Sequence, residues 1–89
     1  MSTTALAWAM KINAPSAPAK FVLACMANFA DDRNQCFAGV DKLADATQLT
    51  EVAVRDALHK LADANLIAEN AGTTSHKRVF TLRVPGRDE

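Results

Sequence analysis

Apolar residues recur at helical spacing in the first half of the chain. Five of them occupy the positions i, i+1, i+4, i+5 and i+8: Phe21, Val22, Cys25, Met26 and Phe29. One side of a helix would bury such a stripe, so the spacing predicts a helix over residues 18–30. Pro18 suits the first turn of that helix, where no backbone N–H is needed. The prolines also predict a break over residues 13–17, after a short Ala-rich helix over residues 4–12.

Two more helices are predicted in the middle of the chain. Asp41 can cap a short helix over residues 41–47. Thr50 is the next capping residue, and an i, i+3, i+4, i+7 stripe follows it, formed by Val54, Ala57, Leu58 and Leu61. This stripe predicts a helix over residues 50–64, which Asn65 can end in a left-handed conformation.

The last third of the chain changes to strand periodicity. Residues 66–70 and 78–84 are strand-like and predict a hairpin, with a polar tip between them. Residues 36–37 are too short for more than a bridge strand, and residues 85–89 are expected to form a flexible tail. These elements predict one domain over residues 1–89, of the α+β class and mostly helical. It would hold three core helices, a preceding short helix and a two-stranded β-hairpin.

This order of elements, with the residues that fill it, resembles the winged helix-turn-helix family. The segment 43–50, LADATQLT, resembles the family's Leu-Ala helix and its Thr-Gly-Leu-Ser turn. The stripe of residues 54–61 and the segment 65–67, NLI, resemble its recognition helix and its Ala-Gly-Leu-Ile exit. Gln48 replaces the turn glycine, which would cost about 1 kcal/mol if this position keeps a positive φ. The resemblance implies a helix-turn-helix over 41–47 and 50–64, with residues 66–84 as the wing.

Three upstream segments extend the resemblance. Residues 7–9 (AWA), 19–23 (AKFVL) and 28–32 (NFADD) are similar to the winged-helix domains of phage replication initiators and of small phage or mobile-element regulators. The resemblance implies a small sequence-specific double-stranded DNA-binding protein that regulates transcription.

Composition and charge narrow the function classes. With 89 residues, of which 49% are hydrophobic, the chain has little interior for a substrate pocket, so we expect no enzyme. Ten basic residues balance ten acidic ones, so the overall charge does not favour nucleic acid. Charge differs by region: residues 41–69 hold three basic and six acidic side chains, whereas residues 70–84 hold three basic and no acidic ones. The wing is therefore the more basic part.

Candidate DNA contacts lie on the second helix of the motif and in the wing tip. They are Thr50, Glu51, Val52, Arg55, Asp56, His59 and Lys60 on the helix, and His76, Lys77 and Arg78 in the tip. Arg55 can donate paired hydrogen bonds to guanine, or it can pair with Glu51 four residues earlier. The tip residues suit contacts with phosphates, or they form a solvated loop.

Three wing charges alone would bind DNA weakly, so this hypothesis needs a homodimer. The predicted dimer interface, or seam, lies on the first helix and consists of Leu6, Trp8 and Met10. Trp8 can instead pack onto the core, which a small domain needs.

No feature of the sequence points to a metal, a cofactor or a membrane. Cys25 and Cys36 have apolar neighbours, which favours reduced core thiols and a cytoplasmic location. The cysteines and histidines show no zinc-ligand spacing, and Asp31 and Asp32 are expected to be solvated. No apolar run is long enough to span a membrane.

Two alternatives stay open. The acidic helix over residues 50–64, the third core helix, could imitate phosphate. The protein could then inhibit a host nucleic-acid-processing protein, as an anti-CRISPR-like factor or an inhibitor of a nuclease or polymerase. Glu51, Asp56 and Asp63 would then make the contacts. The chain could also be the DNA-binding module of a replication initiator, either complete or trimmed.

Overall fold

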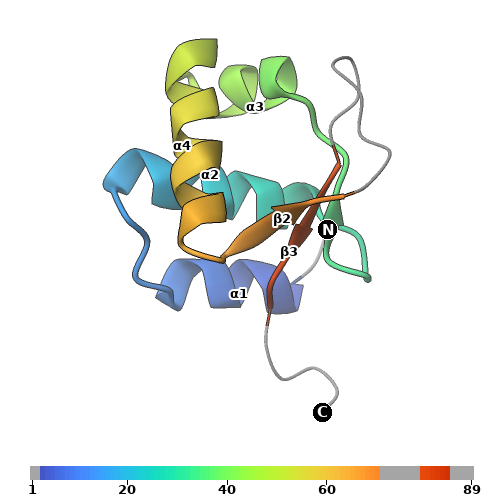
Figure 1. Ribbon diagram of the computed structural model, residues 1–89. Coiled ribbons are helices and arrows are strands. Elements are labelled where there is room, and N and C mark those ends of the chain that lie inside the picture. The colour runs from blue at the N-terminus through green and yellow to red at the C-terminus, as the bar shows by residue number, and fades with distance from the viewer. Residues whose placement is uncertain (1–2, 71–78, 85–89) are drawn as a thin grey trace.

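Helices surround one face of a small antiparallel sheet in the computed structural model, which describes residues 3–70 and 79–84 (Figure 1). The described helices are α1 (Thr3–Lys11), α2 (Ala17–Phe29), α3 (Val40–Thr47) and α4 (Glu51–Asp63), and the strands are β1 (Gln35–Cys36), β2 (Ile67–Glu69) and β3 (Phe80–Leu82). The predicted fold, α+β, mostly helical and of the winged helix-turn-helix kind, is confirmed. The predicted tail, residues 85–89, lies outside the described residues.

The helix α2 lies at the centre of the helical layer. The Ser16 side chain caps it by accepting a hydrogen bond from the Ala19 amide at 3.2 Å, and Pro18 lies in its first turn, as predicted. The predicted buried stripe was partly wrong, because Phe21 is 49% exposed. Since α2 contacts α1, α3, α4 and β1, its buried side is wider than one stripe. It includes Ala19, Val22, Leu23, Met26 and Ala27.

The turn between α3 and α4 is tight and locally hydrogen-bonded. Gln48 ends α3 with φ 62°, which confirms the left-handed conformation expected where the family has glycine. Thr47 is buried, and its hydroxyl donates to the Leu43 carbonyl at 2.7 Å and accepts from the Leu49 amide at 3.3 Å. These bonds fix the angle at which the chain enters α4.

Asp41 does not cap α3, so that prediction was wrong. The helix begins at Val40, and Gly39 is the capping residue without a side-chain bond. The extended backbone of Gly39 already allows its carbonyl to accept the first helical hydrogen bond, from the Leu43 amide at 3.0 Å. Asp41 therefore lies inside the first turn, where its charge still suits the helix dipole.

The predicted hairpin is present, but a third strand joins it. β2 and β3 are antiparallel, and β1 pairs with the other edge of β3, which gives the order β1-β3-β2. Cys36 lies opposite Phe80, in a two-residue strand at 35–36 that is shifted by one residue from the predicted bridge at 36–37. The loop before β1 sets this register, because the Asn34 carbonyl accepts from the Leu82 amide at 2.8 Å.

The core lies between the helices and one face of the sheet. Its largest fully buried side chains are Val22, Leu23, Met26, Cys36, Leu43, Val54, Leu61, Ile67 and Leu82. Leu6 and Trp8 of α1 are partly buried and pack against this core.

Cys25 and Cys36 are free thiols, and burial raises the pKa of both. No helix among residues 3–70 and 79–84 has the length and apolar character needed to cross a membrane.

Candidate nucleic-acid interface

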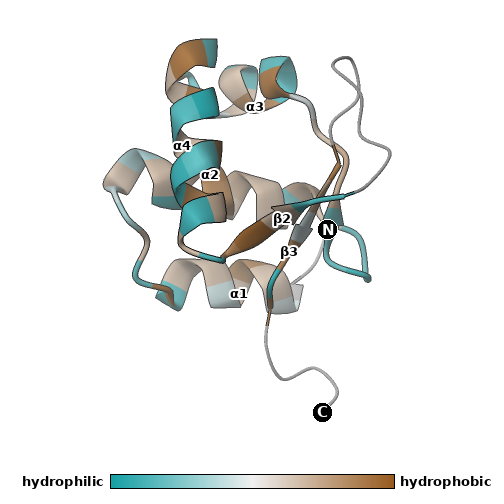
Figure 2. Cartoon of the chain, in the orientation of Figure 1, coloured by the Kyte–Doolittle hydropathy of each residue, from teal (hydrophilic) through white to brown (hydrophobic). Residues whose placement is uncertain are grey.

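The helix α4 presents one apolar side to the core and one polar side to solvent. Val54, Ala57, Leu58 and Leu61 are buried against the rest of the domain. As predicted, Thr50 caps the helix, since its hydroxyl accepts a hydrogen bond from the Ala53 amide at 3.1 Å. Hydrophilic residues occupy much of the side of α4 that is turned toward the viewer in Figure 2. The packing of its apolar side thus leaves the polar side of α4 exposed to solvent.

The seven predicted contacts on the third core helix lie together on this outward face. All of them are exposed: Thr50, Glu51, Val52, Arg55, Asp56, His59 and Lys60. Their spacing of four and of one residue places them on adjacent rows of the helix surface. The structure therefore brings together the helical part of the predicted site.

Each cation on the outward face of α4 lies close to an acidic side chain of the same helix. Arg55 Nη2 is 3.1 Å from Glu51 Oε1, and Lys60 Nζ is 3.1 Å from Asp56 Oδ2. His59 Nε2 is 3.5 Å from Asp63 Oδ2, a pair that is ionic only when the imidazole is protonated. Both permanent cations of this face are thus paired with acids of the same helix. These pairs are exposed, so each stabilises the helix by only about 0 to 1 kcal/mol and can be exchanged for another partner.

The N-terminal part of α4 also presents an apolar side chain to solvent. Val52, the second residue of α4, is 72% exposed and follows Glu51 of the Glu51–Arg55 pair. In a helix-turn-helix, the N-terminal residues of the second helix are those that reach base edges in the major groove. An exposed valine there can contact a thymine methyl group, which polar side chains cannot do as well.

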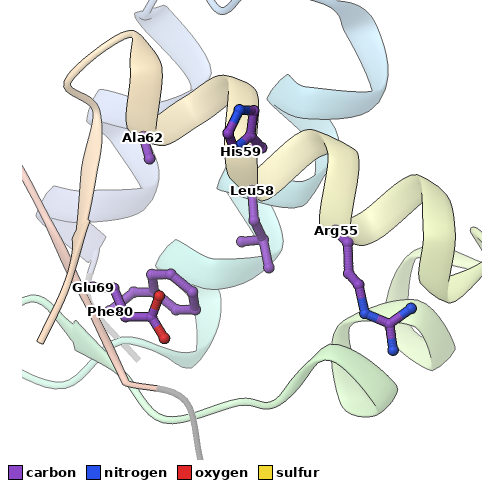
Figure 3. Close-up of a pocket in the computed structure, with 6 residues that line it drawn as sticks. All are labelled: Arg55, Leu58, His59, Ala62, Glu69 and Phe80. Atoms are coloured by element: carbon purple, nitrogen blue, oxygen red, sulfur yellow. The ribbon is translucent and has the colours of Figure 1, made fainter. Parts of the chain in front are cut away.

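A furrow of about 180 Å³ runs between α4 and the sheet (Figure 3). Its lining residues are Arg55, Leu58, His59, Ala62, Glu69 and Phe80. In the close-up, the guanidinium of Arg55 lies at the opposite end of the furrow from Glu69 and Phe80. Glu69 and Phe80 were not among the predicted site residues. No local pattern identifies them, because only the packing of the sheet on α4 brings them to the helix.

The rest of the predicted site is less complete. The wing-tip residues His76, Lys77 and Arg78 lie outside the described residues. Of the predicted dimer seam, Leu6 and Trp8 are partly buried against the core, whereas Met10 is 59% exposed. Within the described part of the chain, no three His, Cys, Asp or Glu side chains gather into a group that could hold a metal ion.

The comparisons with known proteins agree with this geometry at the level of a family. A family model described as a helix-turn-helix domain matches residues 16–67, more than half of the chain. The matched segment runs from the cap of α2 to the start of β2 and includes all of α3, the turn and α4. Neither the curated proteins nor the solved structures gave a match.

Proposed function

Since this chain belongs to the helix-turn-helix domain family, we propose that it is a small sequence-specific double-stranded DNA-binding protein that regulates transcription. The outward face of α4 would enter the major groove, and the wing would contact the phosphate backbone. The resemblance of residues 7–9, 19–23 and 28–32 supports a phage or mobile-element regulator. Such a protein would act in the cytoplasm.

The observation that carries the proposal is the row of exposed side chains at the start of α4. Val52 offers an apolar contact and Arg55 offers a pair of N–H donors, and both lie in the helix half nearest the turn. The side chain of Arg55 is 56% exposed, so it can leave Glu51 for a guanine without opening the core. Guanine O6 and N7 accept the two donors of an arginine in one plane.

The wing would supply contacts that do not depend on base sequence. Residues 70–84 contain Lys77, Arg78 and Arg83 and no acidic residue. Cationic side chains on phosphates position a protein on the duplex, and each neutralised phosphate adds about 0.9 to the salt slope. The two elements would therefore have different roles: α4 would select the base sequence, and the wing would add affinity for any duplex.

A selection from a random duplex library followed by mobility-shift titrations tests the proposal. We expect the full chain to enrich one sequence and to bind it more tightly than scrambled DNA. Arg55→Ala should reduce the preference for that sequence by about 5- to 150-fold, the value of one paired contact. Lys77→Ala should weaken both DNAs by the same factor. The absence of any enriched sequence at about 50 mM salt, or binding without a salt slope, would contradict the proposal.

A protein partner is the second candidate function, because the same face carries several acidic groups. Glu51, Asp56 and Asp63 are exposed along α4 and could imitate a row of phosphates for a basic groove on another protein. The double variant Glu51→Lys/Asp56→Lys separates the two candidates. It should bind DNA more tightly if α4 faces a duplex, and it should lose a co-purifying partner if α4 mimics nucleic acid.

A further inference from the structure

A second surface of the domain lies away from α4, where the end of α1 meets the first turns of α2. Met10, Ala17, Lys20, Phe21 and Ala24 line a groove of about 250 Å³ there. The link between α1 and α2 lies on the opposite side of the ribbon from the sheet (Figure 1). A ligand in this groove would therefore leave the sheet, and the furrow beside it, uncovered.

The groove is apolar and open to solvent. Met10 is 59% exposed and Phe21 is 49% exposed, and they are two of the four large hydrophobic side chains that stand out on the described surface. Removing apolar surface from water stabilises a complex by about 25 cal/mol per Å², so these two side chains favour an apolar occupant. The volume is below the roughly 300 to 1,000 Å³ of a small-molecule pocket. It suits one large side chain of a partner.

The segments that line the groove carry charge of one sign. Residues 3–30, which form α1, the link and α2, contain Lys11 and Lys20 and no acidic residue. Lys20 itself lines the groove, and Lys11 follows Met10 directly. The first turn of α2 also holds no acidic side chain, so the positive end of its dipole adds to the same field. An acidic segment would be attracted here, whereas a basic one would be repelled.

These features argue against a second copy of the chain as the occupant. A symmetric contact would bring Lys11 and Lys20 of both copies together. The apolar area is also small, because a specific interface between two folded proteins needs about 800 Å² from each partner. A short segment docks on less surface, with one anchor residue in a groove and flanking charges for specificity.

We propose that the α1–α2 groove binds a short acidic segment of a partner protein. One large apolar side chain of that segment would fill the space between Met10 and Phe21. Aspartate or glutamate residues beside this anchor would pair with Lys20 and Lys11. The groove would thus recruit a protein while α4 stays available for its own ligand.

Peptide titrations followed by NMR of the labelled full chain test this inference. The probe is a 12-residue peptide with one central Phe flanked by Glu, and the comparison peptides carry Lys instead of Glu or Ala instead of Phe. We expect the Phe-Glu peptide to shift the amides of Met10, Lys20 and Phe21. The Ala peptide should bind at least about tenfold more weakly, the least that one lost apolar anchor would cost. The Lys peptide should also bind more weakly, because Lys11 and Lys20 would repel its charges.

Variants locate the site and separate it from the DNA face. Phe21→Ser should weaken the Phe-Glu peptide at least about tenfold, whereas Phe37→Ser, which changes a phenylalanine that is 51% exposed elsewhere, should not. Lys20→Glu should reverse the preference toward the Lys peptide, and this test does not depend on how Phe21 contributes to folding. Phe21→Ser should still shift DNA in the mobility assay if the proposed function holds.

Three results would overturn the inference. The first is equal binding of the Glu and Lys peptides, and the second is no binding of the Phe-Glu peptide. The third is self-association in sedimentation that Phe21→Ser abolishes, because a second copy would then be the occupant. A chain that binds the peptide and no DNA would refute the proposed function alone.

Discussion

Glu51 controls the side chain on which the DNA hypothesis depends most. Its carboxylate holds Arg55 at 3.1 Å, on the exposed face of α4. To reach a base, Arg55 must leave this partner, and the freed carboxylate would then face the phosphates. The ion pair would therefore lower the proposed affinity for DNA while it stabilises the isolated helix.

We predict that Glu51→Gln tightens DNA binding by about two- to fivefold, since an exposed pair stabilises the free protein by up to about 1 kcal/mol. The measurement is a mobility-shift titration against the selected duplex. Asp63→Asn is the matched control, because it removes the same charge from the far end of the same helix, beside His59. Equal gains in both variants would mean that only net charge matters, and weaker binding by Glu51→Gln would contradict the interpretation of Arg55.

Asp31, which was expected to be solvated, also organises the loop before β1. Its Oδ1 accepts hydrogen bonds from the Gln35 amide at 3.0 Å and from the Arg33 amide at 2.9 Å. These bonds lower the pKa of the carboxyl below its usual value, the bond from Gln35 contributing most. The bonds favour the charged form, so the carboxylate stabilises the fold when it is ionised.

The lowered pKa of Asp31 determines how its contribution to folding stability changes with pH. Because the pKa is lower in the folded state, the stabilisation is present above the ordinary aspartate pKa of about 3.9 and is lost as pH falls through the folded value. We predict that Asp31→Asn is less stable than the parent at pH 6 and that the difference shrinks as the pH falls below the ordinary aspartate pKa of about 3.9. Urea unfolding at several pH values measures this. A difference that stays constant over that range would contradict the role of the ionised carboxylate.

At the scale of elements, the turn of the helix-turn-helix is strained at one residue. Gln48 has φ 62°, which costs a residue with a Cβ about 1 kcal/mol relative to glycine. We predict that Gln48→Gly raises the free energy of unfolding by up to about 1 kcal/mol and the melting temperature by about 4 to 8 °C. Gln48→Ala is the control, since it removes the amide but keeps the Cβ. Stabilisation by both variants would show that the Gln48 side chain, and not its backbone, is unfavourable.

The helices could be predicted from the sequence because their signals are local. Thr50 and the prolines mark where α4 and α2 begin, and the stripe of residues 54–61 marks the buried side of α4. β1 could not be predicted as a full strand, because two residues have no periodicity. It exists because Asp31 shapes the loop and because β3 offers a free edge. The start of α3 was missed because Gly39 caps it through its backbone alone.

The candidate site was predictable only as far as it lies on one helix. The spacing of Arg55 and Glu51 already indicated their ion pair, and the spacing of Lys60 and Asp56 carries the same signal. The furrow was not predictable, because Glu69 and Phe80 reach α4 through sheet packing. The exposure of Phe21 was also missed, because its spacing fits a buried stripe, whereas the buried side of α2 holds Ala19, Val22, Leu23, Met26 and Ala27.

At the scale of the whole molecule, the charge balance limits how one copy can hold DNA. The chain has no net charge, and the cations of α4 are paired with acids of the same helix. One copy would thus neutralise few phosphates, so two copies on neighbouring half-sites would be needed for tight binding. Leu6 and Trp8 pack against the core, which leaves Met10 as the largely exposed member of the predicted seam. Two copies would therefore meet on the DNA rather than through a seam on α1 formed beforehand.

We predict that a duplex with two half-sites, about 10 base pairs apart from centre to centre, binds two copies cooperatively. The slope of log affinity against log salt should be about twice that for a single half-site, because the number of neutralised phosphates doubles. Sedimentation of the free chain at the same concentration should show monomers. Moving one half-site by about five base pairs is the control, since it turns the second copy to the opposite side of the duplex and should remove the cooperativity. One copy per duplex, with equal slopes on both DNAs, would mean that a single domain suffices and that its wing contributes more contacts than its charges imply.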